Sequence, residues 1–274
     1  MSDNNKISED RNSGWRSELR NAMPAKERTA IPRAVMPQLP PLFRVTCNDE
    51  VNMGLSHGQA VLEATRCLDC PSPTCVEGCP VGIDIPGFIK NIQRGDVRRA
   101  AEVLRRTSAL PAVCGRVCPQ ERQCESRCIY HKMKKEPVAI GYLERYAADT
   151  DRMMRRDCDK AENISDPKGI KIAVAGSGPA GLSFAGEMAR RGFEVEVFEA
   201  LHEIGGVLKY GIPEFRLPNS VVDAELESLK AIGVKFHTDI VIGKTLNYDT
   251  LMAKGFKGLF VASGAGLPRF MGIP

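Results

Sequence analysis

The sequence has few aromatic residues and no long apolar segment. Aromatic residues are 6% of the 274 residues, and only one is tryptophan, which leaves little material for a surface that stacks on nucleic-acid bases. No apolar run is long enough to cross a bilayer. Residues 1–30 lack the apolar core and the small-residue cleavage site of a secretory signal, so we predict a cytoplasmic protein. We therefore expect neither a nucleic-acid partner nor a membrane span.

Charges of the two signs are nearly balanced, with 38 lysine and arginine residues against 34 acidic ones. The resulting net charge of +4 is mild and does not indicate a polyanionic partner. The arginines between residues 94 and 106 fit a solvated helix face or a docking face for an acidic redox partner.

Cysteine, in contrast, is abundant, with ten residues in the chain. In a reducing compartment such a number indicates metal or redox chemistry and not a disulfide scaffold. Eight of the ten fall in two runs. The first run has the pattern C-x2-C-x4-C-x3-C-P over residues 67–80, and the second consists of Cys114, Cys118, Cys124 and Cys128.

The spacing of these cysteines predicts ligands for two iron–sulfur clusters. In bacterial ferredoxins three cysteines of such a run bind one cluster, and the fourth, followed by proline, binds another. By the same logic each run here contributes to both clusters. We expect one cluster to be bound by Cys67, Cys70, Cys75 and Cys128, and the other by Cys79, Cys118 and Cys124. The second cluster then has an open position, and the spacing does not decide between Cys114 and an oxygen ligand further along.

Two zinc sites are the alternative, because zinc also favours tetrahedral thiolate coordination. The Cys-Pro pairs and the x4 and x3 spacings differ from paired C-x2-C zinc motifs, however, and no histidine lies between the cysteines. The pattern therefore favours iron–sulfur clusters.

Residues 51–156 predict an α-helical domain around these cysteines. Ser56 and Gln59 form a candidate capping box for a helix that delivers Cys67 at its end. Asp96 is a candidate cap for a helix over residues 97–106, and residues 137–155 predict another helix. Residues 1–50 contain many prolines and predict an extended arm on the surface.

Residues 170–274 predict an α/β domain that follows a polar linker at residues 157–169. A buried-strand pattern at 170–175, a helix at 180–191 and a second strand at 194–198 indicate the first βαβ unit of a doubly wound sheet. A later helix at 220–232 and apolar stretches at 234–242 and 258–262 extend it.

The first turn of this domain carries a dinucleotide fingerprint. The loop between the first strand and helix consists of Gly176, Ser177, Gly178, Pro179, Ala180 and Gly181, whose glycines allow a pyrophosphate to approach the helix N-terminus. Glu199 ends the next strand, where a carboxylate accepts from ribose hydroxyls. The loop alone does not distinguish FAD from NAD(P), but Gly205-Gly206 soon after the acid favours flavin. Lys209 and Arg216 are candidates for the pyrophosphate or flavin end, or are surface charges.

Taken together, these motifs resemble one family of oxidoreductases. The resemblance covers residues 51–274. The matching stretches are residues 67–88, Leu-Pro-Ala-Val-Cys-Gly-Arg-Val-Cys-Pro-Gln (110–120), Ile-Gly-Tyr-Leu-Glu-Arg-Tyr (140–146), Gly-Gly-Val-Leu-Lys-Tyr-Gly-Ile-Pro-Glu-Phe-Arg-Leu-Pro (205–218) and residues 261–265. The sequence is similar to the small (β) subunit of NADPH-dependent glutamate synthase. Its relatives are the large subunit of ferredoxin:NADP oxidoreductase and the N-terminal half of dihydropyrimidine dehydrogenase.

The resemblance implies a double [4Fe–4S] domain followed by a Rossmann-like FAD-binding domain. In this family an acidic or amide side chain on the helix after the last cysteine completes the second cluster, and Glu144 stands there. Cys114 would then be a buried spare, while Cys47 and Cys158 match nothing. The cofactor contacts implied for FAD, besides the glycine loop and Glu199, are Gly206, Val207, Leu208, Arg216, Val241 and Gly264.

The implied function is electron transfer from NADPH through FAD and two clusters to a redox partner subunit. That partner is a glutamate synthase large subunit or, as the alternative, a ferredoxin-linked transhydrogenase subunit. No side chain is expected to act as a general acid or base. The sequence ends at Pro274, where this family inserts an NADPH domain, so we expect an incomplete FAD domain and only part of the full enzyme. A third possibility is a non-enzymatic iron–sulfur carrier whose flavin domain is empty.

Overall fold

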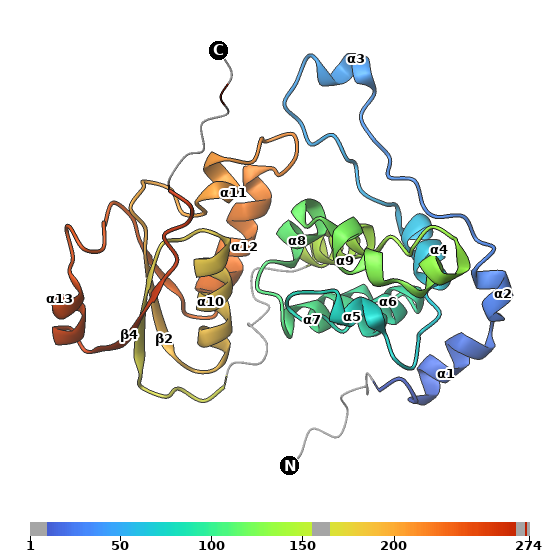
Figure 1. Ribbon diagram of the computed structural model, residues 1–274, viewed down its shortest axis with the longest axis horizontal. Helices are drawn as coiled ribbons and strands as arrows, with labels where there is room; N and C mark the ends of the chain where they lie inside the picture. Colours follow the sequence, from blue (N-terminus) through green and yellow to red (C-terminus); the bar gives the residue numbers. More distant parts are fainter. Residues whose placement is uncertain (1–9, 155–164, 267–271, 273–274) are drawn as a thin grey trace. The chain divides into compact units, whose positions relative to one another are not determined.

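The computed structural model describes residues 10–154, 165–266 and 272. The chain divides into two compact units, residues 1–156 and 157–274 (Figure 1). The first unit is helical and the second contains a parallel sheet. Within the described residues, no helix combines the length and the apolar character that crossing a membrane requires.

The first unit is built from helices between residues 57 and 154. The capping box is confirmed: the Ser56 hydroxyl accepts from the Gln59 amide, and the Gln59 side chain accepts from the Ser56 amide. The Asp96 cap is also confirmed, since its carboxylate accepts from the Arg99 amide. The helices are α4 (His57–Arg66), α5 (Thr74–Glu77), α6 (Ile85–Gln93), α7 (Val97–Arg105), α8 (Pro111–Val117) and α9 (Ile140–Met154), with short 3₁₀ helices at Gln120–Arg122, Glu125–Arg127 and Ile129–Met133.

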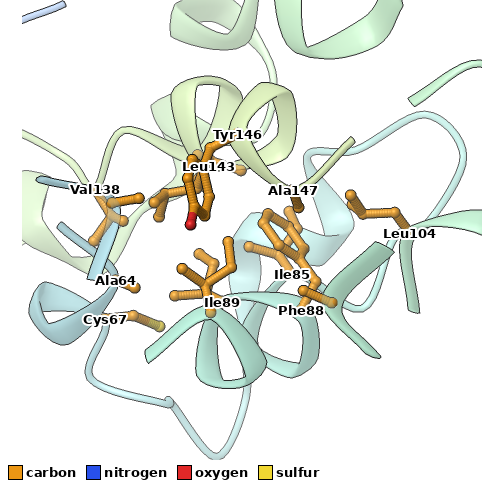
Figure 2. Close-up of a cluster of buried hydrophobic side chains, with 14 of the residues drawn as sticks. Ala64, Cys67, Ile85, Phe88, Ile89, Leu104, Val138, Leu143, Tyr146 and Ala147 are labelled. Atoms are coloured by element: carbon orange, nitrogen blue, oxygen red, sulfur yellow. The ribbon is translucent and has the colours of Figure 1, made fainter. Parts of the chain in front are cut away.

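The core of this unit lies between α4, α6, α7 and α9. Phe88 and Ile92 of α6, Leu104 of α7 and Leu143 of α9 are fully buried in one cluster, and Cys67 belongs to the same cluster (Figure 2). The apolar face of α7 points into this core, and arginines take its other face. The cysteine that ends α4 is therefore anchored by the core.

The N-terminal arm is not extended throughout, which corrects the prediction made from its prolines. It forms the short helices α1 (Gly14–Asn21), α2 (Ala25–Arg28) and α3 (Pro41–Arg44). Pro24 and Pro40 are the residues just before α2 and α3, and Pro41 is the first residue of α3. At these positions proline starts a helix, because the amide it lacks would have no helical acceptor.

The second unit contains a four-stranded parallel sheet in the order β3-β2-β1-β4. The strands are β1 (Lys171–Ala175), β2 (Glu194–Phe198), β3 (Lys235–His237) and β4 (Phe256–Val261), and the helices are α10 (Pro179–Arg190), α11 (Val207–Tyr210), α12 (Asn219–Ala231) and α13 (Tyr248–Ala253). The strand predicted at 194–198 has these bounds. β3 is shorter than its apolar stretch, because the chain turns at Asp239, whose φ is 58°.

Candidate functional site

Four cysteines from the two runs line one cavity in the helical unit. Cys67 ends α4, Cys75 lies in α5, Cys70 lies in the loop between them, and Cys128 joins two 3₁₀ helices. The other walls are mostly apolar and include Ile85, Ile89, Val138 and Ile140. The chain thus brings a thiol from residue 128 to the three thiols of the first run.

The four thiols are close enough to influence one another's protonation. Burial, followed by negative charge on Cys67 and Cys128, raises the pKa of Cys70 to about 11. Burial, followed by the same two thiols, also raises the pKa of Cys75. Thiolates crowded in an apolar cavity are costly unless a positively charged metal centre compensates for them. The donor set therefore fits a thiolate-bound metal cluster.

All nine cysteines among the described residues are free of disulfides. Within the same residues, no group of three His, Cys, Asp or Glu side chains is arranged to hold a single metal ion. Cys158 lies outside the described residues.

A second group of cysteines gathers around α8 and α9. Burial raises the pKa of Cys124 to about 12, with further contributions from the charges of Glu125, Glu144 and Cys79. The thiol of Cys114 shares a hydrogen bond with Cys118, which lowers the pKa of Cys118 to about 7 and raises that of Cys114. Glu144 also raises the pKa of Cys114.

Glu144 of α9 is 5% exposed and is therefore not a solvated helix residue. Its charge acts on the thiols of both Cys114 and Cys124. Cys114, which hydrogen-bonds to Cys118, also belongs to this group. The structure brings both candidates for the open ligand position to the same place.

Glycine at position 115 fixes how closely α8 approaches α9 at this group. A Cβ on Gly115 would lie 2.5 Å from the amide nitrogen and 2.7 Å from the Cα of Arg145. Real Cβ atoms do not come this close to backbone, so any larger residue would separate the helices. The same crossing is held by ion pairs of Arg116 and Arg145 with Glu50 and Asp149.

A buried lysine that sequence reasoning missed lies beside the first group. Lys90 of α6 is fully buried, and its ammonium donates to the carbonyl of Cys67 at 2.6 Å and to Gln93 at 2.7 Å. Burial lowers the pKa of Lys90 to about 8, although negative charge on Cys67 opposes this. A lysine within an apolar helix gives no local sequence signal for such a role, because its acceptor is a backbone carbonyl 23 residues away.

The glycine loop of the second unit connects β1 to α10. Gly176 has φ = 102°, and a Cβ there would collide with the carbonyl of Ala262. A Cβ on Gly181 would collide with the carbonyl of Gly176. A Cβ on Gly178, in contrast, would have no atom within 4 Å. The loop is tightly packed on one side and open beside Gly178 at the N-terminus of α10.

Glu199 supports this loop from the end of β2. One of its carboxylate oxygens accepts from the amide of Ser177 at 2.8 Å and from its hydroxyl at 2.5 Å, and the other accepts from the amide of Leu201 at 3.0 Å. Burial would raise the pKa of Glu199, but these hydrogen bonds outweigh it and lower the pKa. Each carboxylate oxygen has more than one lone pair, so an additional donor can still be accepted.

The second glycine turn packs directly against the first. Gly206 has φ = 52°, and a Cβ there would lie 2.9 Å from the Cα of Gly178. The amide of Gly205 donates to the hydroxyl of Ser177 at 2.9 Å. The two glycine segments predicted as parts of one cofactor site are thus in contact.

The remaining predicted contacts vary in their surroundings. Leu208 is buried, whereas Val207, Arg216, Val241 and Gly264 are exposed. Lys209 forms ion pairs with two carboxylates, at 2.6 and 2.7 Å. The amide of Val241 already donates to the hydroxyl of Thr245 at 2.8 Å.

Comparison with known families assigns a type to each unit. Residues 44–156 match the family described as dihydropyrimidine dehydrogenase domain II, 4Fe-4S cluster. Residues 174–225 match the family described as NAD(P)-binding Rossmann-like domain. The chain therefore has an iron–sulfur domain followed by a Rossmann-like dinucleotide-binding domain.

Curated relatives extend over most of the chain. The glutamate synthase [NADPH] small chain of Azospirillum brasilense is 35% identical over 82% of this chain and 46% of its own length. The Escherichia coli (strain K12) protein of the same name is 37% identical over 78% of this chain and 45% of its own. The NAD-dependent dihydropyrimidine dehydrogenase subunit PreT of the same strain is 35% identical, over 81% and 54%. The chain thus spans about half the length of these relatives.

Among solved structures, histamine dehydrogenase from Rhizobium sp. 4-9 is similar over 73% of this chain and 24% of its own, with 20% identity and a TM-score of 0.35.

Proposed function

We propose that this chain, a relative of the glutamate synthase small chains and of the dihydropyrimidine dehydrogenase subunit PreT, is the electron-transfer module of an oxidoreductase. In this proposal it binds two [4Fe–4S] clusters and FAD, and it transfers electrons from NADPH to a partner subunit. We keep the cytoplasm as its expected location.

The observation that carries the proposal is the cavity lined by Cys67, Cys70, Cys75 and Cys128. Thiols from both runs converge there, as ligation of one cluster by both runs requires. The apolar walls would limit water access to the cluster, and access of water influences reduction potential. The match to a 4Fe-4S domain family over residues 44–156 supports the same assignment.

A second cluster at Cys79, Cys118 and Cys124, with Glu144 as the fourth ligand, is supported by their electrostatic proximity. Carboxylate ligation would also explain why an acidic residue is buried there. Cys114 is the competing ligand. Substituting each one separately distinguishes them.

FAD at the glycine loop is supported by the open space beside Gly178 and by the contact between the two glycine turns. The match of residues 174–225 to an NAD(P)-binding Rossmann-like family is compatible with either dinucleotide. In this arrangement the N-terminus of α10 faces the pyrophosphate, and Glu199 orients the loop while accepting from the ribose.

When bound, the flavin would supply two-electron chemistry and the clusters one-electron chemistry. The residues of this chain bind and orient these groups. The thiolates would hold the iron, while Lys90 fixes the carbonyl of Cys67 and Glu199 fixes Ser177. No side chain described here needs to accept or release a proton from a substrate.

The partner remains part of the proposal. Relatives named as glutamate synthase small chains favour a glutamate synthase large subunit. A ferredoxin-linked transhydrogenase subunit is the alternative. The test is co-purification with candidate large subunits, followed by an assay of the complex for NADPH-dependent formation of glutamate from 2-oxoglutarate and glutamine. Glutamate formation favours the glutamate synthase large subunit over the transhydrogenase subunit.

Iron, sulfide and flavin content of the anaerobically purified protein tests the cofactors. We expect about eight iron and eight sulfide per chain, the content of two four-iron clusters, together with FAD. Clusters without flavin would favour the iron–sulfur carrier. Zinc without iron would contradict the proposal in all its forms.

A further inference from the structure

The loop between the first two cysteines contains a buried acidic residue. Asp69 is 0% exposed and has φ = 53°, a left-handed conformation that few residues other than glycine adopt. It lies between Cys67 and Cys70, so its backbone conformation determines how these two thiols are presented. A carboxylate this deeply buried must be paired, because an isolated buried charge is strongly unfavourable.

Two arginines of the N-terminal arm provide that pairing, and a third binds the backbone of the same residue. Arg16 of α1 forms a buried ion pair with the Asp69 carboxylate, and Arg20 bonds to it at 2.6 Å. Arg11 donates to the backbone carbonyl of Asp69 at 2.7 Å. The side chain and the backbone of this one residue are therefore both held by the arm.

The next part of the arm contacts the same end of α4. Arg28 of α2 is 2% exposed and donates to the carbonyl of Thr65 at 3.0 Å and to that of Cys67 at 3.5 Å. The Tyr130 hydroxyl lies 2.7 Å from the carbonyl of Arg66 and 3.3 Å from that of Arg28. The arm thus contacts two residues that line the cavity, Cys67 and Tyr130.

These arginines lie outside the part of the chain that matches the iron–sulfur family. The match begins at residue 44, whereas the contacts come from residues 11–28. Asp69 lies within the matched residues, but the origin of its arginine partners is a feature of this chain that the family match does not cover.

We infer that Arg16, Arg20 and Asp69 form a clamp that positions the Cys67–Cys70 loop for the first cluster and sets the charge beside it. The inference rests on the proposed function. The three are positioning residues: they hold the loop and touch neither electron donor nor acceptor. The contacts described for the clamp are with the arm and the Cys67–Cys70 loop, so the second group of cysteines serves as an internal control.

The test compares the full-length wild type with Asp69→Asn and Arg20→Gln. Asparagine also tolerates the left-handed conformation, so Asp69→Asn removes the charge while preserving the turn. A ferrous chelator is added to the anaerobically purified protein, and iron release is followed over time. We expect half of the iron to leave about tenfold faster in both variants, because Asp69→Asn leaves the buried Arg16 without its carboxylate and Arg20→Gln leaves Asp69 with only one of its two arginines. The other half should leave at the wild-type rate.

The reduction potentials of the clusters distinguish an electrostatic effect of the clamp from a general loss of structure. Asp69→Asn removes negative charge and should raise the potential of one of the two clusters, whereas Arg16→Gln removes positive charge and should lower it. A merely structural role would not produce shifts of opposite sign. The single tryptophan, Trp15, packs against Arg94 with 4.2 Å between the guanidinium carbon and the ring centroid, so its fluorescence reports whether the arm stays attached.

Arg44→Gln is the matched control, because Arg44 of α3 bonds only within the arm, to Leu39 and Gln38. It should leave iron release and both potentials unchanged. If Asp69→Asn does not fold, Arg20→Gln decides, since Arg20 is partly exposed. Wild-type protein with about eight iron but no faster release in the variants would overturn the clamp alone. Wild-type protein without iron would overturn the clamp and the proposed function together.

Discussion

The two units of this chain build their candidate sites from different parts of the polypeptide. In the helical unit the donors are thiol side chains, brought together from residues 67 to 128. In the α/β unit they are mainly the backbone amides of one loop, supported by a single carboxylate. The first site therefore depends on tertiary packing of several helices, whereas the second depends on one local turn.

This difference determines how each site can be disrupted. A side-chain ligand can be removed without moving the backbone, so the helical unit should lose a metal centre in discrete steps. A site made of backbone amides, such as the glycine loop, has no ligand side chain to remove, so its ligand is blocked most directly by adding atoms to the loop. Substitutions that delete groups and substitutions that add them should therefore act on different units.

Cys128→Ser should have the largest effect, because it deletes the one ligand that the second run contributes to the first cavity. We expect iron content to fall by about half, with flavin content unchanged. Metal analysis and electron paramagnetic resonance of the reduced protein measure the iron and its clusters, and the absorbance of the extracted flavin measures the flavin content. Cys47→Ser is the control, since Cys47 lies in the arm outside both groups. Unchanged iron in Cys128→Ser would refute the shared cavity as a cluster site.

Adding a single methyl group to the glycine loop should give two separable effects. Gly181→Ala would collide with the carbonyl of Gly176 and should destabilise the α/β unit by about 1–3 kcal/mol. Gly178→Ala meets no protein atom within 4 Å, so stability should change by less than about 1 kcal/mol. Its methyl would instead occupy the space for the pyrophosphate and weaken flavin binding by about tenfold or more. Denaturant unfolding and flavin titration distinguish the two.

If Gly178→Ala binds flavin as tightly as the wild type, the pyrophosphate does not lie at this loop. Equal stability of the two variants would show instead that the close contact between Gly181 and Gly176 does not prevent the α/β unit from accommodating a methyl group.

Glu144→Ala compared with Cys114→Ser tests the open ligand position. If Glu144 is the ligand, its removal should change the spectrum and potential of one cluster, whereas Cys114→Ser should leave both clusters as they are. A change in Cys114→Ser alone would reassign the ligand to the thiol. Redox titration followed by paramagnetic resonance makes the measurement.

Glu199→Gln should have the smallest effect and a distinct pH dependence. The folded pKa of Glu199 is lowered below its ordinary value of 4.5, so its stabilisation is present above pH 4.5 and is lost as the pH falls through the lower folded pKa. The contribution should be about 1 kcal/mol or less. Hydrogen exchange of peptides from residues 171–198, measured at pH 6 and pH 4, should show a smaller acid-induced loss of protection in the variant. An identical acid response would contradict the role of these hydrogen bonds.

Local signals predicted much of the secondary structure. The capping box at Ser56 and Gln59, the cap at Asp96 and the strand at 194–198 each depend on residues within a few positions of one another. Such short-range interactions can be read from sequence because the interacting groups are fixed by chain geometry. The helix predicted from residue 137 begins only at Ile140, three residues later than expected.

Long-range pairing could not be predicted in this way. Asp69 and Arg16 are 53 residues apart, and Lys90 and Cys67 are 23 apart. Neither the charge of Asp69 nor that of Lys90 stands out in a sequence with many exposed charges, and only burial shows that each requires a partner. The arm was expected to lie on the surface because of its many prolines, and its arginines gave no sign of these buried contacts, since arginine usually remains in solvent.

The cavity that joins Cys67, Cys70 and Cys75 to Cys128 also sets an order of events during synthesis. Its fourth thiol, Cys128, is made about sixty residues after Cys67, so a ribosome-bound chain that has exposed only the first run holds three thiols without the fourth. The arm, which precedes both, is already available to pair with Asp69 at that stage. A metal centre inserted early would have an incomplete shell, and the completed pocket becomes available to cluster-delivery proteins only once Val138 and Ile140, which also line it, have left the exit tunnel.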